Sequence, residues 1–184
     1  FTIYSATFDG RLTKVADDVA VMSAGDGRVA WVTTQGEVMT ETADDPSPHR
    51  VPVPLSAGCH MASTIDLQSG LGAFAANRSV IAMTERCGSG GNAGDELLAF
   101  DPSGRMLVHL AGGPAYELSL TPDAILAETS GRTSSDFDVV RYDLVTGRLA
   151  DLGGVAKSRP PAQGAGDYVL WYDTKGGHVA RIPG

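Results

Sequence analysis

The sequence predicts an all-β fold, a β-propeller of four blades that is closed by pairing between its N-terminal and C-terminal strands. Three observations support this prediction. Apolar residues alternate in short runs, no window of ten or more residues follows the 3.6-residue helical period, and two short patterns recur about every 45 residues. A repeat of roughly 40 to 50 residues with about four short strands is typical of a propeller blade.

Composition agrees with a globular chain that has many turns. The 184 residues are 42% apolar, which is enough to bury a core, and we expect one domain over residues 1–184. The 23 Gly and 10 Pro indicate turns rather than long helices. No run approaches about eighteen consecutive apolar residues, so we expect no membrane insertion. A net charge of −8 without a Lys/Arg cluster argues against binding to nucleic acid.

The first recurring pattern is a turn. An aromatic or apolar residue is followed by Asp, a few turn-forming residues, Gly-Arg and a second apolar residue. Asp can accept hydrogen bonds from its own backbone and Gly can adopt a positive φ, so each copy predicts a hairpin turn between two strands. The three clear copies and a degraded fourth lie at residues 8–12, 100–106, 142–149 and, degraded, 44–51.

The second recurring pattern is a strand-like apolar run that follows a small polar turn. Its four copies lie at residues 29–33, 80–84, 125–129 and 169–173, and their first residues are 51, 45 and 44 positions apart. We therefore expect these runs to occupy the same position in successive blades.

The two ends of the chain predict how the ring closes. Residues 1–18 are typical of the second half of a blade, and residues 164–184 contain a turn, a strand at 167–172 and a short strand at 178–182 that would supply the first half. Counting from Val169 through the C-terminus to Val29 gives 44 residues, which matches the internal period. Pairing of the two ends would leave no long unpaired edge. The alternative is that the chain forms part of a larger ring.

Residues 118–127, Leu-Ser-Leu-Thr-Pro-Asp-Ala-Ile-Leu-Ala, resemble the strand, Ser-Pro-Asp-Gly turn and strand of TolB-type and WD-like bacterial propellers. Thr121 stands where Ser is usual in that family, and Ala124 stands where Gly is usual. The resemblance implies a propeller with protein or ligand binding at a ring face, and some members of such families are hydrolases or lyases. It assigns no functional residue to this chain.

Cys59 and Cys87 are the two cysteines of the chain and are 28 residues apart. An even number of cysteines is compatible with one disulfide in an oxidising compartment, so we expect an extracytoplasmic or secreted protein whose leader has been removed. The alternative is a pair of free thiols in a cytosolic protein. No Cys-x-x-Cys motif is present to indicate redox chemistry or a zinc site.

Three aromatic residues are candidates for ligand binding. Trp31 and Trp171 occupy the same position in their blades, and Tyr172 follows the second of them. They would either pack between blades or form an aromatic platform for a sugar or a peptide.

Other motifs point to no cofactor. His49, His60, His109 and His178 show no metal-ligand spacing, so we expect no metal, and the glycine-rich run at 88–94 lacks the Lys of a phosphate-binding loop. Neither a Gly-x-Ser-x-Gly motif nor another nucleophile-and-base pair is recognisable, so no catalytic residue is predicted.

We therefore expect a binding module without turnover, which contacts a protein or glycan partner through loops on one face of the ring. The longest candidate loops lie at residues 44–50, 88–95, 131–136 and 157–166. The alternative is a propeller hydrolase or lyase that acts on a glycan or small ligand with two carboxylates in a central channel. The sequence leaves the oligomeric state open.

Overall fold

The structure is a computed structural model that describes residues 1–6, 12–61, 73–88, 94–110, 115–130, 136–156, 163–165, 168–173 and 176–181. Within these ranges the chain forms strands and turns and contains no α-helix, which confirms the all-β prediction. It follows that this part of the chain has no helix with the length and apolarity needed to cross a membrane.

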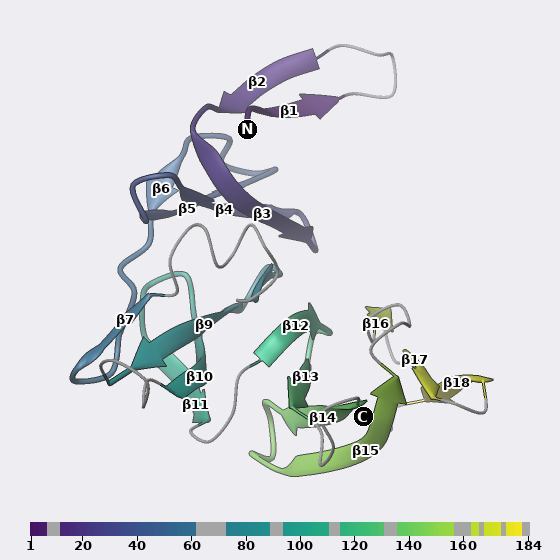
Figure 1. Ribbon diagram of the computed structural model, residues 1–184. Coiled ribbons are helices and arrows are strands. Elements are labelled where there is room, and N and C mark those ends of the chain that lie inside the picture. The colour runs from purple at the N-terminus through teal and green to yellow at the C-terminus, as the bar shows by residue number, and fades with distance from the viewer. Residues whose placement is uncertain are drawn as a thin grey trace.

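Five antiparallel sheets follow one another along the described chain (Figure 1). The first two contain β1 (Ile3–Ala6) and β2 (Leu12–Ala16), then β3 (Val19–Gly25), β4 (Arg28–Thr33), β5 (Val38–Thr42) and β6 (His49–Arg50). The third contains β7 (Cys59–Met61), β8 (Phe74–Ala76), β9 (Ile81–Cys87), β10 (Gly94–Phe100) and β11 (Met106–Leu110). The last two contain β12 (Ala115–Leu120), β13 (Ala124–Ser130), β14 (Asp136–Asp143) and β15 (Leu149–Ala156), then β16 (Gln163–Ala165), β17 (Tyr168–Asp173) and β18 (Gly176–Arg181).

We call the four sheets that follow the β1–β2 hairpin blade 1 (β3–β6), blade 2 (β7–β11), blade 3 (β12–β15) and blade 4 (β16–β18). Their inner strands lie in a row, because β3 contacts β8, β8 contacts β12 and β12 contacts β16. Figure 1 shows the blades following one another in an arc. This arrangement of successive antiparallel sheets is the arrangement of a propeller.

Both recurring patterns have the predicted structure. The strand-like runs lie in β4, β9, β13 and β17, each of which pairs with the inner strand of its blade. The described copies of the turn pattern join the last two strands of blades 1, 2 and 3. In blade 2, the Asp101 carboxylate accepts hydrogen bonds from the backbone N–H groups of Ser103 (2.9 Å) and Arg105 (3.1 Å), and Gly104 has a φ of 86°.

These turns make folding stability sensitive to acid. The Ser103 side chain and the Arg105 backbone N–H lower the pKa of Asp101 to about 2, and the Thr146 backbone N–H lowers that of Asp143 to about 2. A lowered pKa means that the folded state favours the carboxylate, so this stabilisation is complete above about pH 4 and is lost as the pH falls towards 2. In thermal melts at several pH values, the difference in melting temperature between wild type and D101N should therefore be largest near neutral pH. A difference that stays constant down to pH 2 would contradict this assignment.

The described residues show no strand pairing that closes the ring between the two chain ends. No strand pairing among the described residues joins β1–β2 to blade 4, and Figure 1 places them at opposite ends of the arc. The first copy of the turn pattern falls between β1 and β2, mostly outside the described residues. By this pattern, β1 and β2 correspond to the last two strands of a blade. Blade 4 has three described strands, because β16 precedes the two strands that the sequence predicts. The described strands therefore do not confirm a four-blade ring closed by the two chain ends, and both this closure and a larger ring remain predictions.

The core lies between the blades. Ile81, Met83, Leu98 and Phe100 pack against blade 1, whereas Ala82, Leu97 and Ala99 on the opposite face of the same sheet pack against Ile125 and Ala127 of blade 3. Because both faces of blade 2 are buried, its two central strands carry continuous apolar runs instead of an alternating pattern.

Hydrogen bonds also join neighbouring inner strands and the turns that follow them. The Ala76 backbone N–H donates to Ser23 Oγ (2.9 Å), and Asn77 Nδ2 donates to the Thr121 carbonyl (3.0 Å). Asn77 is 3% exposed, and its Oδ1 accepts hydrogen bonds from the next turn residues. Although Asn77 begins an Asn-x-Ser tripeptide, its side chain is thus a structural link between blades and is not accessible for glycosylation in the folded protein.

Candidate functional site

A disulfide joins Cys59 of β7 to Cys87 at the end of β9, as the two-cysteine count predicts. The two residues are also direct partners in the β7–β9 register. The bond fixes the connection between blades 1 and 2, residues 51–61, against the end of β9. Both thiols are consumed, so neither cysteine is available as a thiolate ligand for a metal.

Glu85 is a charged residue at a core position. Residues alternate along β9, so Glu85 lies on the same face as Ile81 and Met83, which pack on blade 1. Glu85 is 0% exposed. A buried carboxylate requires hydrogen-bond donors, and Ser56 supplies two of them: its backbone N–H to Oε2 (3.0 Å) and its hydroxyl to Oε1 (2.6 Å).

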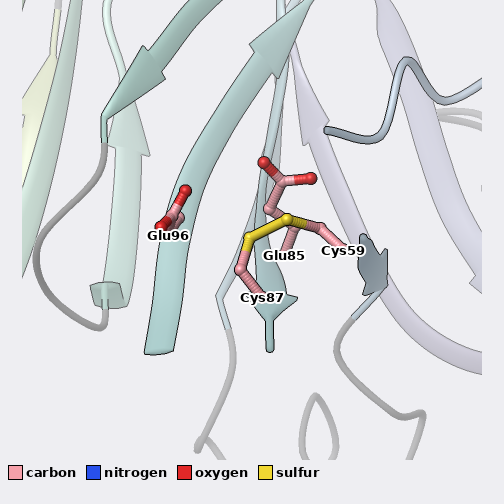
Figure 2. A group of neighbouring side chains, drawn as sticks. All are labelled: Cys59, Glu85, Cys87 and Glu96. Carbon is pink, nitrogen blue, oxygen red and sulfur yellow. A yellow bond between two sulfur atoms is a disulfide. The ribbon is translucent and has the colours of Figure 1, made fainter. Parts of the chain in front are cut away.

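Two further side chains converge on Glu85. Glu96 of β10 is its direct partner in the β9–β10 register, and His109 extends from β11. His109 Nε2 lies 2.5 Å from Glu96 Oε2 and 3.1 Å from Glu85 Oε1. Figure 2 shows the two glutamates on their strands with the disulfide beside Glu85. We call Ser56, Glu85, Glu96 and His109 the acid–histidine cluster.

The geometry of the cluster does not fit a Ser-His-acid triad. A triad uses one ring nitrogen for the serine and the other for the acid. Here the same Nε2 atom faces both carboxylates and lies 3.4 Å from Ser56 Oγ, while the Ser56 hydroxyl donates to Glu85 instead. The arrangement can hold a proton or a cation between the carboxylates and the imidazole, but it does not activate the serine.

A groove of about 510 Å³ lies beside the cluster, between blade 1 and the connection to blade 2. We call it the connection groove, and it is lined by Gly36, Glu37, Val38, Arg50, Val51, Pro52, Val53, Leu55 and Met61. Its buried members, Val38 and Val51, are held together by a backbone hydrogen bond of 2.8 Å. Leu55 is 39% exposed, and Arg50 and Glu37 form an ion pair of 3.3 Å that is open to solvent.

A second cavity of about 360 Å³ lies along the inner strands β3, β8 and β12. Its lining includes Ser23, Asn77 and Ser119 together with Gly25 and small alanine residues. Ser23 and Asn77 already take part in the hydrogen bonds between blades. We call this cavity the inner hollow.

The aromatic candidates have different outcomes. Trp31 is 2% exposed and packs with Ile3 and Val19 between the β1–β2 hairpin and blade 1, so the packing interpretation is correct for this residue. Its ring is not accessible as a ligand platform. Trp171 and Tyr172 lie on β17 opposite His178 and Gly177, but their side chains fall outside the described part of the structure, and their binding role stays a prediction.

The loops predicted to bind are only partly described. Residues 44–50 form the turn that leads to Arg50 at the groove, whereas most of 88–95, 131–136 and 157–166 lies outside the described residues. The sequence analysis missed the connection at 51–61 and the acid–histidine cluster. One signal was present, because the alternation along β9 and β10 places Glu85 and Glu96 in phase with core residues.

No protein-family model matches the chain, and no curated protein matches it. Among solved structures, TolB from Acinetobacter baumannii matches with a TM-score of 0.58 and 16% identity over 98% of this chain. This likeness supports a β-propeller fold. The computationally designed Ika4 protein matches with a TM-score of 0.51 and 12% identity over 97% of both chains. BamB from Moraxella catarrhalis has a TM-score of 0.45 at 18% identity, over 98% of this chain and 55% of its own.

The structural matches to TolB and Ika4 support the propeller fold and carry no assignment of activity. The chain spans 46% of the length of the TolB chain. The role of this propeller is therefore argued below from its own side chains.

Proposed function

We propose that this propeller is a non-catalytic binding module, and that its connection groove takes an apolar side chain from an extended segment of a protein partner. The observation that carries the proposal is an apolar wall that includes the exposed Leu55, in a groove whose lining also contains a solvent-exposed ion pair. Pockets of roughly 300 to 1,000 Å³ with apolar walls and a few polar groups are typical ligand sites.

The apolar part of the groove supplies affinity. Leu55 and Met61 project from the connection and β7, and Val38 and Val51 form buried parts of the lining. Apolar surface gives about 25 cal/mol for each Å² removed from water, so one inserted Leu, Met or Phe side chain contributes roughly 1.5 to 3 kcal/mol. The rigid attachment of β7 through the disulfide keeps this wall in place before binding, which lowers the entropic cost.

The charged rim supplies selectivity. Glu37 and Arg50 are both exposed, and an exposed ion pair is worth at most about 1 kcal/mol, so partner charges can replace it. A segment with a basic residue near Glu37 and an acidic residue near Arg50 would match the rim. The net charge of −8 favours encounters with partners that are basic overall.

Other sites and activities have weaker support. The polar groups of Ser23 and Asn77 at the inner hollow already pair with the protein, so less binding capacity remains there. An aromatic platform for a glycan could not include Trp31, because its side chain is buried. A hydrolase would need an accessible pair of carboxylates, but Glu85 is fully buried and accepts hydrogen bonds from Ser56.

The disulfide favours an oxidising, extracytoplasmic location for this binding module.

Selection from a random peptide library displayed on phage tests the proposal. Wild-type protein should enrich peptides with a central large apolar residue, and Leu55→Glu should abolish their binding by placing a charge in the groove. Val145→Glu is the matched control, because Val145 is 81% exposed on a turn of blade 3 far along the chain from the groove. Equal binding by wild type and L55E would contradict the groove. Turnover in a parallel screen of glycosides, esters and peptides, lost on a single Asp or Glu substitution, would favour the hydrolase or lyase alternative.

A further inference from the structure

Two glutamates on neighbouring strands form a like-charge pair inside the acid–histidine cluster. Glu85 and Glu96 are direct cross-strand partners, and opposed like charges destabilise a sheet. Glu85 is fully buried, and no Lys or Arg forms an ion pair with it among the described residues. The single imidazole of His109 is shared between the two carboxylates. The cluster is therefore short of positive charge at a place where negative charge is expensive.

We propose that His109, Glu85 and Glu96 bind a divalent first-row transition-metal ion such as Zn²⁺, through His109 Nε2 and one oxygen of each carboxylate. This site goes beyond the proposed peptide binding and does not depend on it. Its three ligands come from three successive strands of blade 2, β9, β10 and β11, which are joined edge to edge.

The three ligand atoms converge, but they lie closer together than a bound ion would hold them. Nε2 lies 2.5 Å from Glu96 Oε2 and 3.1 Å from Glu85 Oε1, and the carboxylates of Glu85 and Glu96 offer oxygens within 4.8 Å of each other. Ligand atoms about 2.0 to 2.2 Å from a tetrahedral ion are separated by roughly 3.4 Å. An outward movement of the partly exposed His109 ring by about an ångström would create this separation.

Ser56 would position the buried ligand. Its N–H and O–H groups hold the two oxygens of Glu85, so the carboxylate cannot rotate freely. Hydrogen-bonded carboxylates of this kind are usual in metal sites, where outer partners orient the ligands. The connection that carries Ser56 is itself held by the disulfide at Cys59.

The ligand types select the class of metal. An imidazole nitrogen with two carboxylate oxygens suits Zn²⁺, Mn²⁺ or Fe²⁺ better than Ca²⁺ or Mg²⁺, which take oxygen ligands. Glu96 and His109 are partly exposed, so an ion can reach the site from solvent and a water can complete its coordination. The two positive charges of the ion would balance the two carboxylates.

Calorimetric titration of ZnCl₂ into the chelator-treated, disulfide-intact protein tests the proposal. Wild type should bind one equivalent saturably. His109→Gln and Glu96→Gln should each weaken that binding at least tenfold, while circular dichroism shows that the β fold is kept. His49→Gln is the matched control, because His49 also contacts one carboxylate, Asp45 at 2.8 Å, but on an exposed turn. It should leave the affinity unchanged.

A second measurement reports on the ligand atom directly. In a ¹H–¹⁵N correlation spectrum of the imidazole groups, one equivalent of Zn²⁺ should shift the Nε2 resonance of His109 and leave that of His49 in place. Absence of saturable binding would show that the cluster holds only a proton shared by His109 and the glutamates. Binding of equal affinity in wild type and H109Q would place the ion elsewhere. Either result overturns the proposal.

Discussion

Replacing Gly104 with alanine should lower the free energy of unfolding by about 3 kcal/mol or more, because two penalties combine at this turn. Gly104 has a φ of 86°, which alanine adopts only with strain, and an added Cβ would lie 2.5 Å from the carbonyl oxygen of Pro52 and 2.6 Å from its Cγ. The turn of blade 2 would have to move away from the connection that lines the groove. Urea denaturation followed by circular dichroism measures the loss.

Gly58→Ala is the control for the strain alone. Gly58 has a similar φ of 78°, but an added Cβ would meet no atom within 4 Å. We expect a loss of about 1 kcal/mol there, from the backbone conformation. Equal losses at the two positions would show that the close approach of Gly104 to Pro52 does not contribute to stability.

Removal of the disulfide should be the second large effect. The double variant Cys59→Ser, Cys87→Ser releases a loop of 28 residues, and loop-closure entropy predicts a loss of roughly 3 to 4 kcal/mol. The melting temperature of the double variant should fall, and that of wild type should fall by a similar amount in the presence of a reductant.

The same variant should also weaken peptide binding at the groove. Met61 is part of the groove lining and lies on β7, which the disulfide attaches to the end of β9. A loss of stability below about 1 kcal/mol would show that strand pairing holds β7 in place without the bond. Full stability loss with unchanged peptide affinity would show that the wall forms independently of the disulfide.

The features predicted correctly from the sequence depend on local chemistry. Asp101 accepts hydrogen bonds from the backbone of its own turn, and Gly104 supplies the positive φ. These interactions therefore lie within five consecutive residues of the sequence pattern. Strands β4, β9 and β13 were recognisable because residues on both of their faces are buried and their apolar runs are continuous. Cys59 and Cys87 were simple to pair because the chain has two cysteines.

The features that were missed depend on strand pairing between distant residues. β16 has only three residues, Gln163–Ala165, and no alternation of apolar residues reveals it. This first strand of blade 4 was therefore not expected. Ser56 and His109 are 53 positions apart and meet only once the connection folds over blade 2. Trp31 and Trp171 could be placed at equivalent positions, but burial of the first ring depends on how the β1–β2 hairpin packs.

The central claim is that a partner segment binds in the connection groove, and nuclear magnetic resonance of the ¹⁵N-labelled protein tests it most directly. On titration with a peptide from the phage selection, backbone amide shifts should concentrate at residues 36–38 and 50–61 and should be absent in the L55E variant. Shifts that concentrate instead around the inner hollow, at residues 23–26, 75–77 and 118–122, would contradict the claim and place the binding site at the inner strands.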